Sequence, residues 1–150
     1  MISTKYQELT RQPEVIMDAA YPVMSNLANA AALLYGQLEQ VNWAGFYLCR
    51  DGALWLGPFG GKPACVRIDH GKGVCGTAWA TGQTQLVEDV HAFPGHIACD
   101  SASASEIVVP LFRDDEVVGV LDIDSPVKGR FTGTDREGLE VIARLIEKML

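Results

Sequence analysis

Two strand pairs, each joined by a two-residue acidic turn, constrain the fold of this chain more than any other feature. The four strands are expected over residues 41–49, 53–59, 106–113 and 116–124. The first pair flanks Asp51-Gly52, a dipeptide typical of tight hairpins because both positions can adopt positive φ. The second pair flanks Asp114-Asp115. The sequence therefore predicts two antiparallel hairpins.

Helical periodicity marks both ends of the chain. Helices are expected over residues 14–38 and 135–149, where apolar side chains recur at helical spacing. Pro13 suits the start of the first helix, and Pro22 should either kink it or delay its true start. Thr134 and Glu137 form the Ser/Thr-x-x-Glu pattern of a capping box before the last helix.

Shorter elements separate the two hairpins. They are a third strand over 64–69, a short helix within 71–83 closed by Gly82, a strand over 84–89 and a polar loop over 90–105. This order predicts an α+β fold, a six-stranded antiparallel sheet with helices mainly on one face. A length of 150 residues suits a single domain over residues 1–150.

Composition and charge exclude several classes of protein. Hydrophobic residues make up 48% of the chain and charged residues 21%, which excludes disorder for the bulk of the chain. A net charge of −7 argues against nucleic acid and anionic membranes as partners. Neither a membrane-spanning apolar run nor a secretory signal is visible, so we expect a cytoplasmic protein.

The four cysteines differ in their surroundings. Cys49 ends a predicted strand and is expected to be a small half-buried apolar side chain. Cys65 opens a predicted strand, Cys75 lies near the start of the short helix, and Cys99 lies in the polar loop. None of these three belongs to a periodic apolar stripe, so packing in a core explains them poorly.

Two kinds of chemistry could use these cysteines. A zinc site could combine them with histidines, but structural zinc ligands come in close pairs, and the chain has no C-x-x-C motif. A thiol–disulfide cycle needs only cysteines that meet in space. His96 near Cys99, or Lys62 near Cys65, could lower the pKa of an attacking thiol.

Acidic and aromatic side chains supply a second candidate cluster. Strand alternation puts Asp122 and Asp124 on one face, and Glu106 starts the neighbouring strand. On a semi-buried face these carboxyl groups would repel one another, share a proton and hold an ammonium group; a solvated strand end is the alternative. Trp43 and Tyr47, four residues apart on a predicted strand, also share a face. They are either core residues or an aromatic wall for a small cationic ligand.

Several segments of the chain resemble one enzyme family. They are VNWAGFYL, LGPFGGKPACVRI, GKGVCGTA, VEDVHAFPGHIACD, SEIVVPL and VVGVLDIDSP. They are similar to the free methionine-(R)-sulfoxide reductases, which are stand-alone GAF domains, and the similarity runs from about residue 13 to the end. The resemblance implies a GAF-like fold and a thiol-dependent reduction of free methionine (R)-sulfoxide, with thioredoxin as reductant and no cofactor or metal.

The resemblance also implies roles for individual residues. Cys99 would be the catalytic thiol that becomes a sulfenic acid, Cys65 its main resolving partner and Cys75 an additional one. The substrate pocket would comprise Trp43, Tyr47, Glu106, Asp122 and Asp124. The sequence does not decide whether the resting disulfide is Cys65–Cys99 or Cys75–Cys99. It also does not decide the oligomeric state, for which a homodimer is one possibility. A GAF-type sensor of small molecules or redox state is the alternative function.

Overall fold

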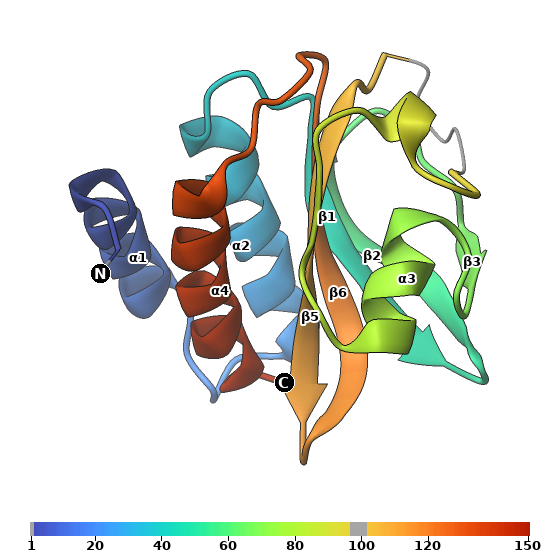
Figure 1. The fold of residues 1–150 in the computed structure, drawn as a ribbon. Helices are drawn as coiled ribbons and strands as arrows, with labels where there is room; N and C mark the ends of the chain where they lie inside the picture. The colour runs from blue at the N-terminus through green and yellow to red at the C-terminus, as the bar shows by residue number, and fades with distance from the viewer. Residues whose placement is uncertain (1, 97–101) are drawn as a thin grey trace.

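The computed structural model describes residues 2–96 and 102–150. Among these residues, six strands form one antiparallel sheet in the order β3-β2-β1-β6-β5-β4 (Figure 1). The strands are β1 (Trp43–Arg50), β2 (Ala53–Gly61), β3 (Arg67–Asp69), β4 (Gln85–Val87), β5 (Ser105–Arg113) and β6 (Glu116–Ser125). The predicted α+β class and six-stranded sheet are therefore confirmed.

Both predicted hairpins form around the expected turns. Asp51 and Gly52 have φ of 51° and 79°, and Asp114 and Asp115 have φ of 53° and 64°. Two successive positive φ angles twist a turn in the sense that matches the twist of the flanking strands. The short outer strands differ more from expectation, because β3 covers only Arg67–Asp69 of the predicted 64–69.

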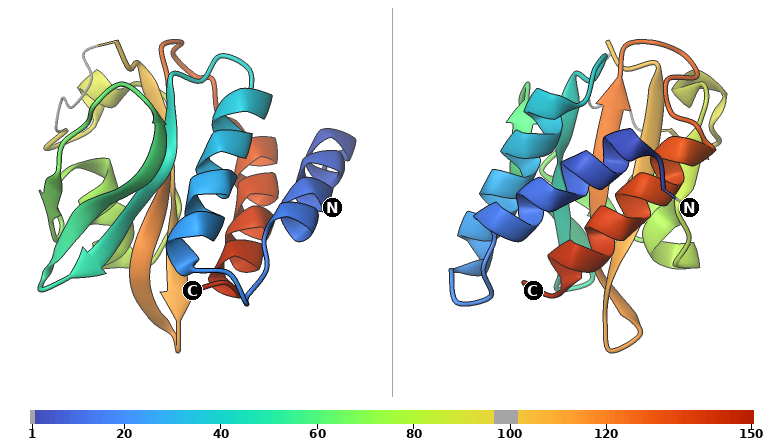
Figure 2. Two further views of the ribbon diagram at one scale, coloured as in Figure 1. Left: turned by 180° about the vertical axis from the view of Figure 1, so that it is seen from behind. Right: turned by 90° about the vertical axis from the view of Figure 1, so that its left-hand side faces the viewer.

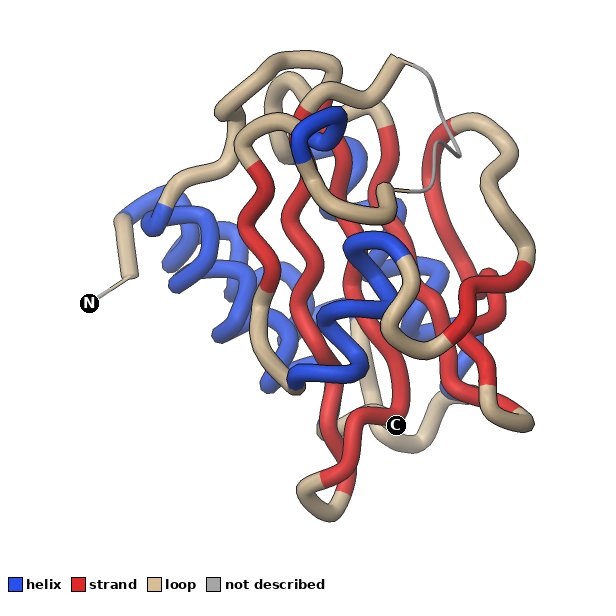
Figure 3. Tube along the Cα trace, turned by 45° about the vertical axis from the view of Figure 1, so that its right-hand side comes forward, coloured by secondary structure: helices blue, strands red, loops and turns tan. Residues whose placement is uncertain are grey.

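Helices cover the two faces of the sheet unequally. The helices are α1 (Thr4–Ile16), α2 (Val23–Gln37), α3 (Gly73–Thr81) and α4 (Gly133–Glu147), with a 3₁₀ turn η1 (Val90–Ala92). Figures 1 and 2 show α2 and α4 lying against one face with α1 outside them, while α3 covers the other face. Figure 3 shows α3 and the loops around it in front of the strands.

The predicted continuous helix over 14–38 is wrong. Helix α1 ends at Ile16, and α2 begins directly after Pro22, which is its N-cap. Of the two effects expected of Pro22, a kink or a delayed start, the structure shows the delayed start. Pro13 lies in the last turn of α1 and not at its start. Asn26 stabilises the break: its Nδ2 donates to the Asp18 carbonyl at 2.8 Å, and its Oδ1 accepts from the Asp18 N–H at 3.2 Å.

The capping box of α4 lies two residues earlier than predicted. The Thr132 N–H donates to Asp135 Oδ2 at 2.8 Å, so the pair is Thr132 with Asp135 and not Thr134 with Glu137. Asp135 also accepts from the Tyr6 hydroxyl at 2.7 Å, which ties α1 to α4. This long-range partner is invisible to a pattern based on spacing alone.

We expect Gly138→Ala to destabilise the protein by about 1–3 kcal/mol, the usual cost of overpacking. A Cβ at Gly138 would overlap the ring of Tyr6, which is buried and fixed by its hydrogen bond to Asp135. Gly36→Ala is the matched control, because α2 leaves open space there, and it should stabilise by about 0.5–1 kcal/mol. Urea unfolding of both variants measures the difference; equal midpoints would contradict this packing.

No helix in the described ranges is both long and apolar enough to cross a membrane.

Candidate functional site

A pocket lies on the face of the sheet that carries α3. Six of the residues predicted from the sequence line it: Trp43, Tyr47, Cys75, Glu106, Asp122 and Asp124. Strand pairing brings them together, because Trp43 lies opposite Asp124 across β1 and β6, and Asp124 lies opposite Glu106 across β6 and β5. Three adjacent strands thus present aromatic and acidic side chains to one space.

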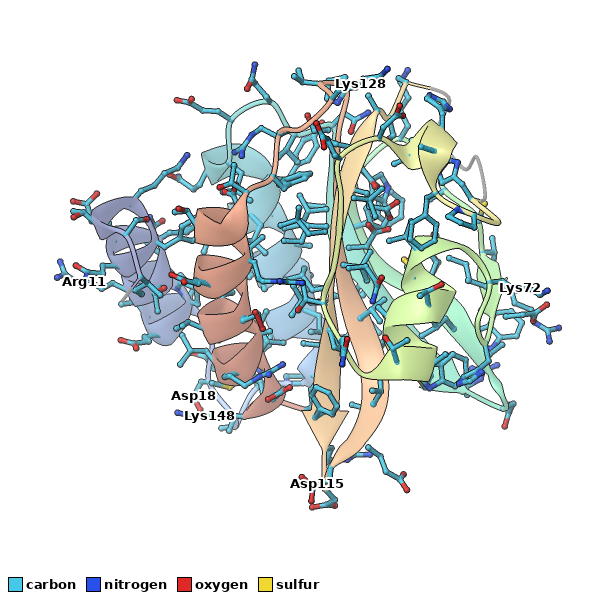
Figure 4. The ribbon with its side chains drawn as sticks, viewed as in Figure 1. Arg11, Asp18, Lys72, Asp115, Lys128 and Lys148 are labelled. Atoms are coloured by element: carbon cyan, nitrogen blue, oxygen red, sulfur yellow. The ribbon has the colours of Figure 1, made fainter. Side chains whose placement is uncertain are left out.

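The carboxyl groups are buried together. Glu106 and Asp122 are 7% and 5% exposed, which sets them apart from surface charges such as Lys72 and Asp115 (Figure 4). Side-chain hydrogen bonds join Glu106 to both aspartates. Burial, followed by the charges of the two aspartates, raises the pKa of Glu106 well above its usual range. Glu106 is therefore the group of this cluster in which burial and neighbouring charge most favour the protonated form.

Asp122 has a mixed environment. Burial raises the pKa of Asp122 above its usual range, and hydrogen bonds with Glu106, Cys75 and Asp124 offset only part of that rise. These bonds favour the ionised form of Asp122 relative to Glu106. The cluster thus combines a proton donor with negative charge, which suits both protonation of a substrate and binding of a cation.

Cys75 is a protonated thiol in this arrangement. It lies in the first turn of α3, and its Sγ donates to Asp122 Oδ2 at 3.3 Å. A helix N-terminus ordinarily lowers a thiol pKa. Here burial and the nearby Asp122, Glu106 and Asp124 raise the pKa of Cys75 well above its usual range. Cys75 is therefore a poor nucleophile in this state.

Two aromatic rings line the same pocket as the acids. Trp43 and Tyr47 are buried, and their ring centroids lie 5.9 Å apart. Both also fix the loop after β2: Trp43 Nε1 donates to the Lys62 carbonyl at 3.1 Å, and the Tyr47 hydroxyl donates to the Cys65 carbonyl at 2.8 Å. Trp43 and Tyr47 are therefore core residues and pocket residues at the same time. The sequence had left these two interpretations as alternatives.

The structure describes two of the three remaining cysteines, Cys49 and Cys65. Cys65 is half-buried in the loop before β3, not in a strand as predicted, and it is disulfide-bonded. Cys49 and Cys75 are free thiols. Cys49 is half-buried, and its Sγ lies 3.6 Å from the Val117 carbonyl, as expected for a packing residue. The predicted catalytic thiol, Cys99, lies outside the described residues.

The pocket includes residues that the sequence did not assign to it. His96 and Ser103 line it, together with the apolar side chains of Ile68 and Val74. Burial and the neighbouring His91 lower the pKa of His96, so a neutral imidazole faces the site. Periodicity cannot place residues of an irregular loop, and the only signal was the density of small and polar residues around 96–105.

Comparison with known proteins supports the same assignment. The GAF domain family matches residues 23–150. Over 145 residues the chain is 54% identical to the free methionine-R-sulfoxide reductase of Escherichia coli (strain K12), covering 97% of this chain and 88% of that protein. The family resemblance seen in the sequence is therefore confirmed.

Solved structures extend this similarity to three dimensions. The fRMsr of Staphylococcus aureus in its reduced form has a TM-score of 0.94 and 50% identity, covering 99% of this chain and 97% of that one. The free methionine-R-sulfoxide reductase of Neisseria meningitidis in complex with its substrate has a TM-score of 0.91 and 46% identity, covering 96% and 87%. The chain belongs to the free methionine-R-sulfoxide reductase family, oxidoreductases built on the GAF fold.

Proposed function

We propose that this protein reduces free L-methionine (R)-S-oxide to L-methionine. The observation that carries the proposal is the carboxyl cluster of buried Glu106 and Asp122 with half-buried Asp124, which shares one pocket with Trp43 and Tyr47. A substrate that combines an ammonium group with a thioether-like side chain matches this pocket at both ends. The preference for the R epimer comes from the names of the relatives.

The acidic cluster accounts for selection of a free amino acid. An α-ammonium brings a positive charge to the ionised carboxylates, whereas the amide nitrogen of a peptide-bound residue brings none. The methyl and methylene groups of the substrate would pack against Trp43 and Tyr47. We expect the sulfoxide oxygen to lie near Glu106, the group that holds a proton.

The chemistry requires a thiolate, for which we propose Cys99. Its sulfur attacks the sulfoxide sulfur while Glu106 protonates the oxygen. The sulfur–sulfur bond of this adduct breaks as the hydroxyl group passes to Cys99. Methionine is released and a sulfenic acid remains, so two electrons pass from the thiol to the substrate. A second thiol then displaces water from the sulfenic acid and forms a disulfide.

We propose Cys65 as that second thiol and Cys65–Cys99 as the resulting disulfide. Two observations support this choice over Cys75: Cys65 is disulfide-bonded, and Cys75 is a free thiol with a raised pKa. The Tyr47 hydroxyl fixes the backbone of Cys65 beside the pocket. Thioredoxin in the cytoplasm would reduce the disulfide by exchange, so the cycle needs no bound cofactor.

Cys65→Ser should separate reduction of the sulfoxide from recycling of the enzyme. Without added reductant, the pre-reduced variant should form about one methionine per chain, as the wild type does, because resolution follows the chemical step. Thioredoxin-dependent turnover should fall at least about tenfold, since the protonated Cys75 thiol attacks slowly. Rapid-quench measurement of methionine, followed by steady-state assay, checks both phases.

Two results of this experiment would contradict the proposal. A wild-type protein that binds the sulfoxide but forms no methionine would be a sensor and not a reductase. Equal loss of both phases in Cys65→Ser would place Cys65 in the reduction step itself.

A further inference from the structure

Cys75, Glu106 and Asp122 surround one point in the pocket with a thiol and two carboxyl groups. One ligand atom of each lies within 4.8 Å of the others, and all three residues are buried. Cys75 Sγ and Asp122 Oδ2 are 3.3 Å apart. Bonds of about 2.3 Å to sulfur and 2.0 Å to oxygen put two ligands of a tetrahedral zinc about 3.5 Å apart. These side chains therefore need only small shifts to share an ion.

A second observation is one oxygen atom of the cluster that lacks a hydrogen-bond partner. Asp122 is 5% exposed and lines the pocket, and its Oδ1 has no hydrogen-bond partner among the described residues. Buried carboxylate oxygens are ordinarily paired with a donor or a cation. This oxygen thus points to a ligand that brings positive charge into the pocket.

We propose that Cys75, Glu106 and Asp122 bind a thiophilic divalent cation, Zn²⁺, with water in the fourth position. Three protein ligands and one water form a common zinc arrangement. The thiolate selects against Mg²⁺ and Ca²⁺, which prefer all-oxygen sites. This set differs from the structural zinc site considered from the sequence, because it uses one cysteine and two acids of the substrate pocket.

The bound ion would occupy the position of the substrate's ammonium group. Both are cations drawn to the same carboxyl groups, so Zn²⁺ should act as a reversible competitive inhibitor that chelation removes. The competition rests on the proposed function, whereas the metal site itself does not.

Co²⁺ is a direct probe of the site, since a cobalt–thiolate bond gives a charge-transfer band in the near ultraviolet. The protein is used with its Cys65 disulfide formed, and among the residues that the structure describes Cys49 and Cys75 are then the free thiols. We expect the band in the wild type and in the matched control Cys49→Ser, and its loss in Cys75→Ser. Competition with a chromophoric chelator gives the affinity for Zn²⁺, which Mg²⁺ in excess should not change.

Asp122→Asn tests the site without removing the thiol. We expect it to weaken Zn²⁺ binding at least about tenfold, since loss of even an outer-shell partner costs about 10–100-fold. This variant decides the question if Cys75→Ser fails to fold.

Three results would overturn the proposal. A wild type without the cobalt–thiolate band, an unchanged band in Cys75→Ser, or unchanged Zn²⁺ affinity in Asp122→Asn would each exclude the site, whatever the activity of the protein. Zn²⁺ binding that leaves the KM for the sulfoxide unchanged would exclude the competition. Failure of the proposed function appears instead as absent methionine formation in metal-free protein.

Discussion

Cys99→Ser should reduce methionine formation to background, in the first turnover as well as in the steady state. A serine hydroxyl is far less acidic than a thiol and cannot form the sulfenic acid on which the cycle depends. Cys75 cannot replace Cys99, because burial and three carboxyl groups keep its thiol protonated. A rapid-quench assay of pre-reduced protein without external reductant measures this step.

Cys49→Ser is the matched control for this experiment. Burial raises the pKa of the Cys49 thiol to about 11, and the residue does not line the pocket. Its replacement should leave the first turnover intact. If Cys99→Ser still formed about one methionine per chain, the nucleophile would be another cysteine.

Removal of single carboxyl groups from the pocket should have the next largest effect. We expect Glu106→Gln, Asp122→Asn and Asp124→Asn to lower kcat/KM by about 10²–10⁴-fold, the usual contribution of general acid catalysis, together with weaker substrate binding. The Glu106 variant removes the carboxyl group whose protonated form is favoured by burial, and the aspartate variants remove the charge that we propose pairs with the substrate's ammonium.

Asp115→Asn provides the control for loss of a carboxylate. Asp115 lies at the exposed tip of the β5–β6 hairpin, far from the pocket (Figure 4), so its replacement should leave kcat/KM unchanged. Losses below about tenfold in all three pocket variants would refute the role of the acidic cluster.

The raised pKa of Glu106 also predicts a trade between activity and stability. Folding keeps Glu106 protonated, whereas the unfolded chain releases that proton above about pH 4.3. The wild type therefore loses stability as the pH rises from there towards the folded pKa. In urea unfolding at about pH 8, Glu106→Gln should have a larger free energy of unfolding than the wild type. The difference between the two free energies should be smaller at about pH 5.

The local parts of the site could be predicted from the sequence because they depend on short-range periodicity. A period of two residues in β6 put Asp122 and Asp124 on one face. The turns at Asp51-Gly52 and Asp114-Asp115 fixed the two hairpins. Both inferences use residues that are close in the chain.

The long-range parts could not be predicted in this way. The pairing of β1 with β6 sets Trp43 opposite Asp124, and no local pattern specifies which strands of two hairpins become neighbours. The helix break at Pro22 was uncertain because apolar spacing continued across it. The state of Cys75 depends on burial against Asp122, which outweighs the effect of the helix N-terminus.

One steady-state measurement tests the central claim most directly. NADPH oxidation, coupled through thioredoxin and thioredoxin reductase, is followed with free methionine (R)-sulfoxide, its S epimer, N-acetyl-methionine sulfoxide and a peptide containing the sulfoxide. The acetylated compound keeps the sulfoxide end and removes the ammonium charge. We expect kcat/KM for the free R epimer to exceed that for the acetylated compound and for the peptide at least about 30-fold, because unpairing a buried charge costs about 2–5 kcal/mol. The R epimer should also be preferred over the S epimer, as the names of the relatives indicate. Equal kcat/KM for the acetylated and free compounds, or turnover of the peptide alone, would contradict the account.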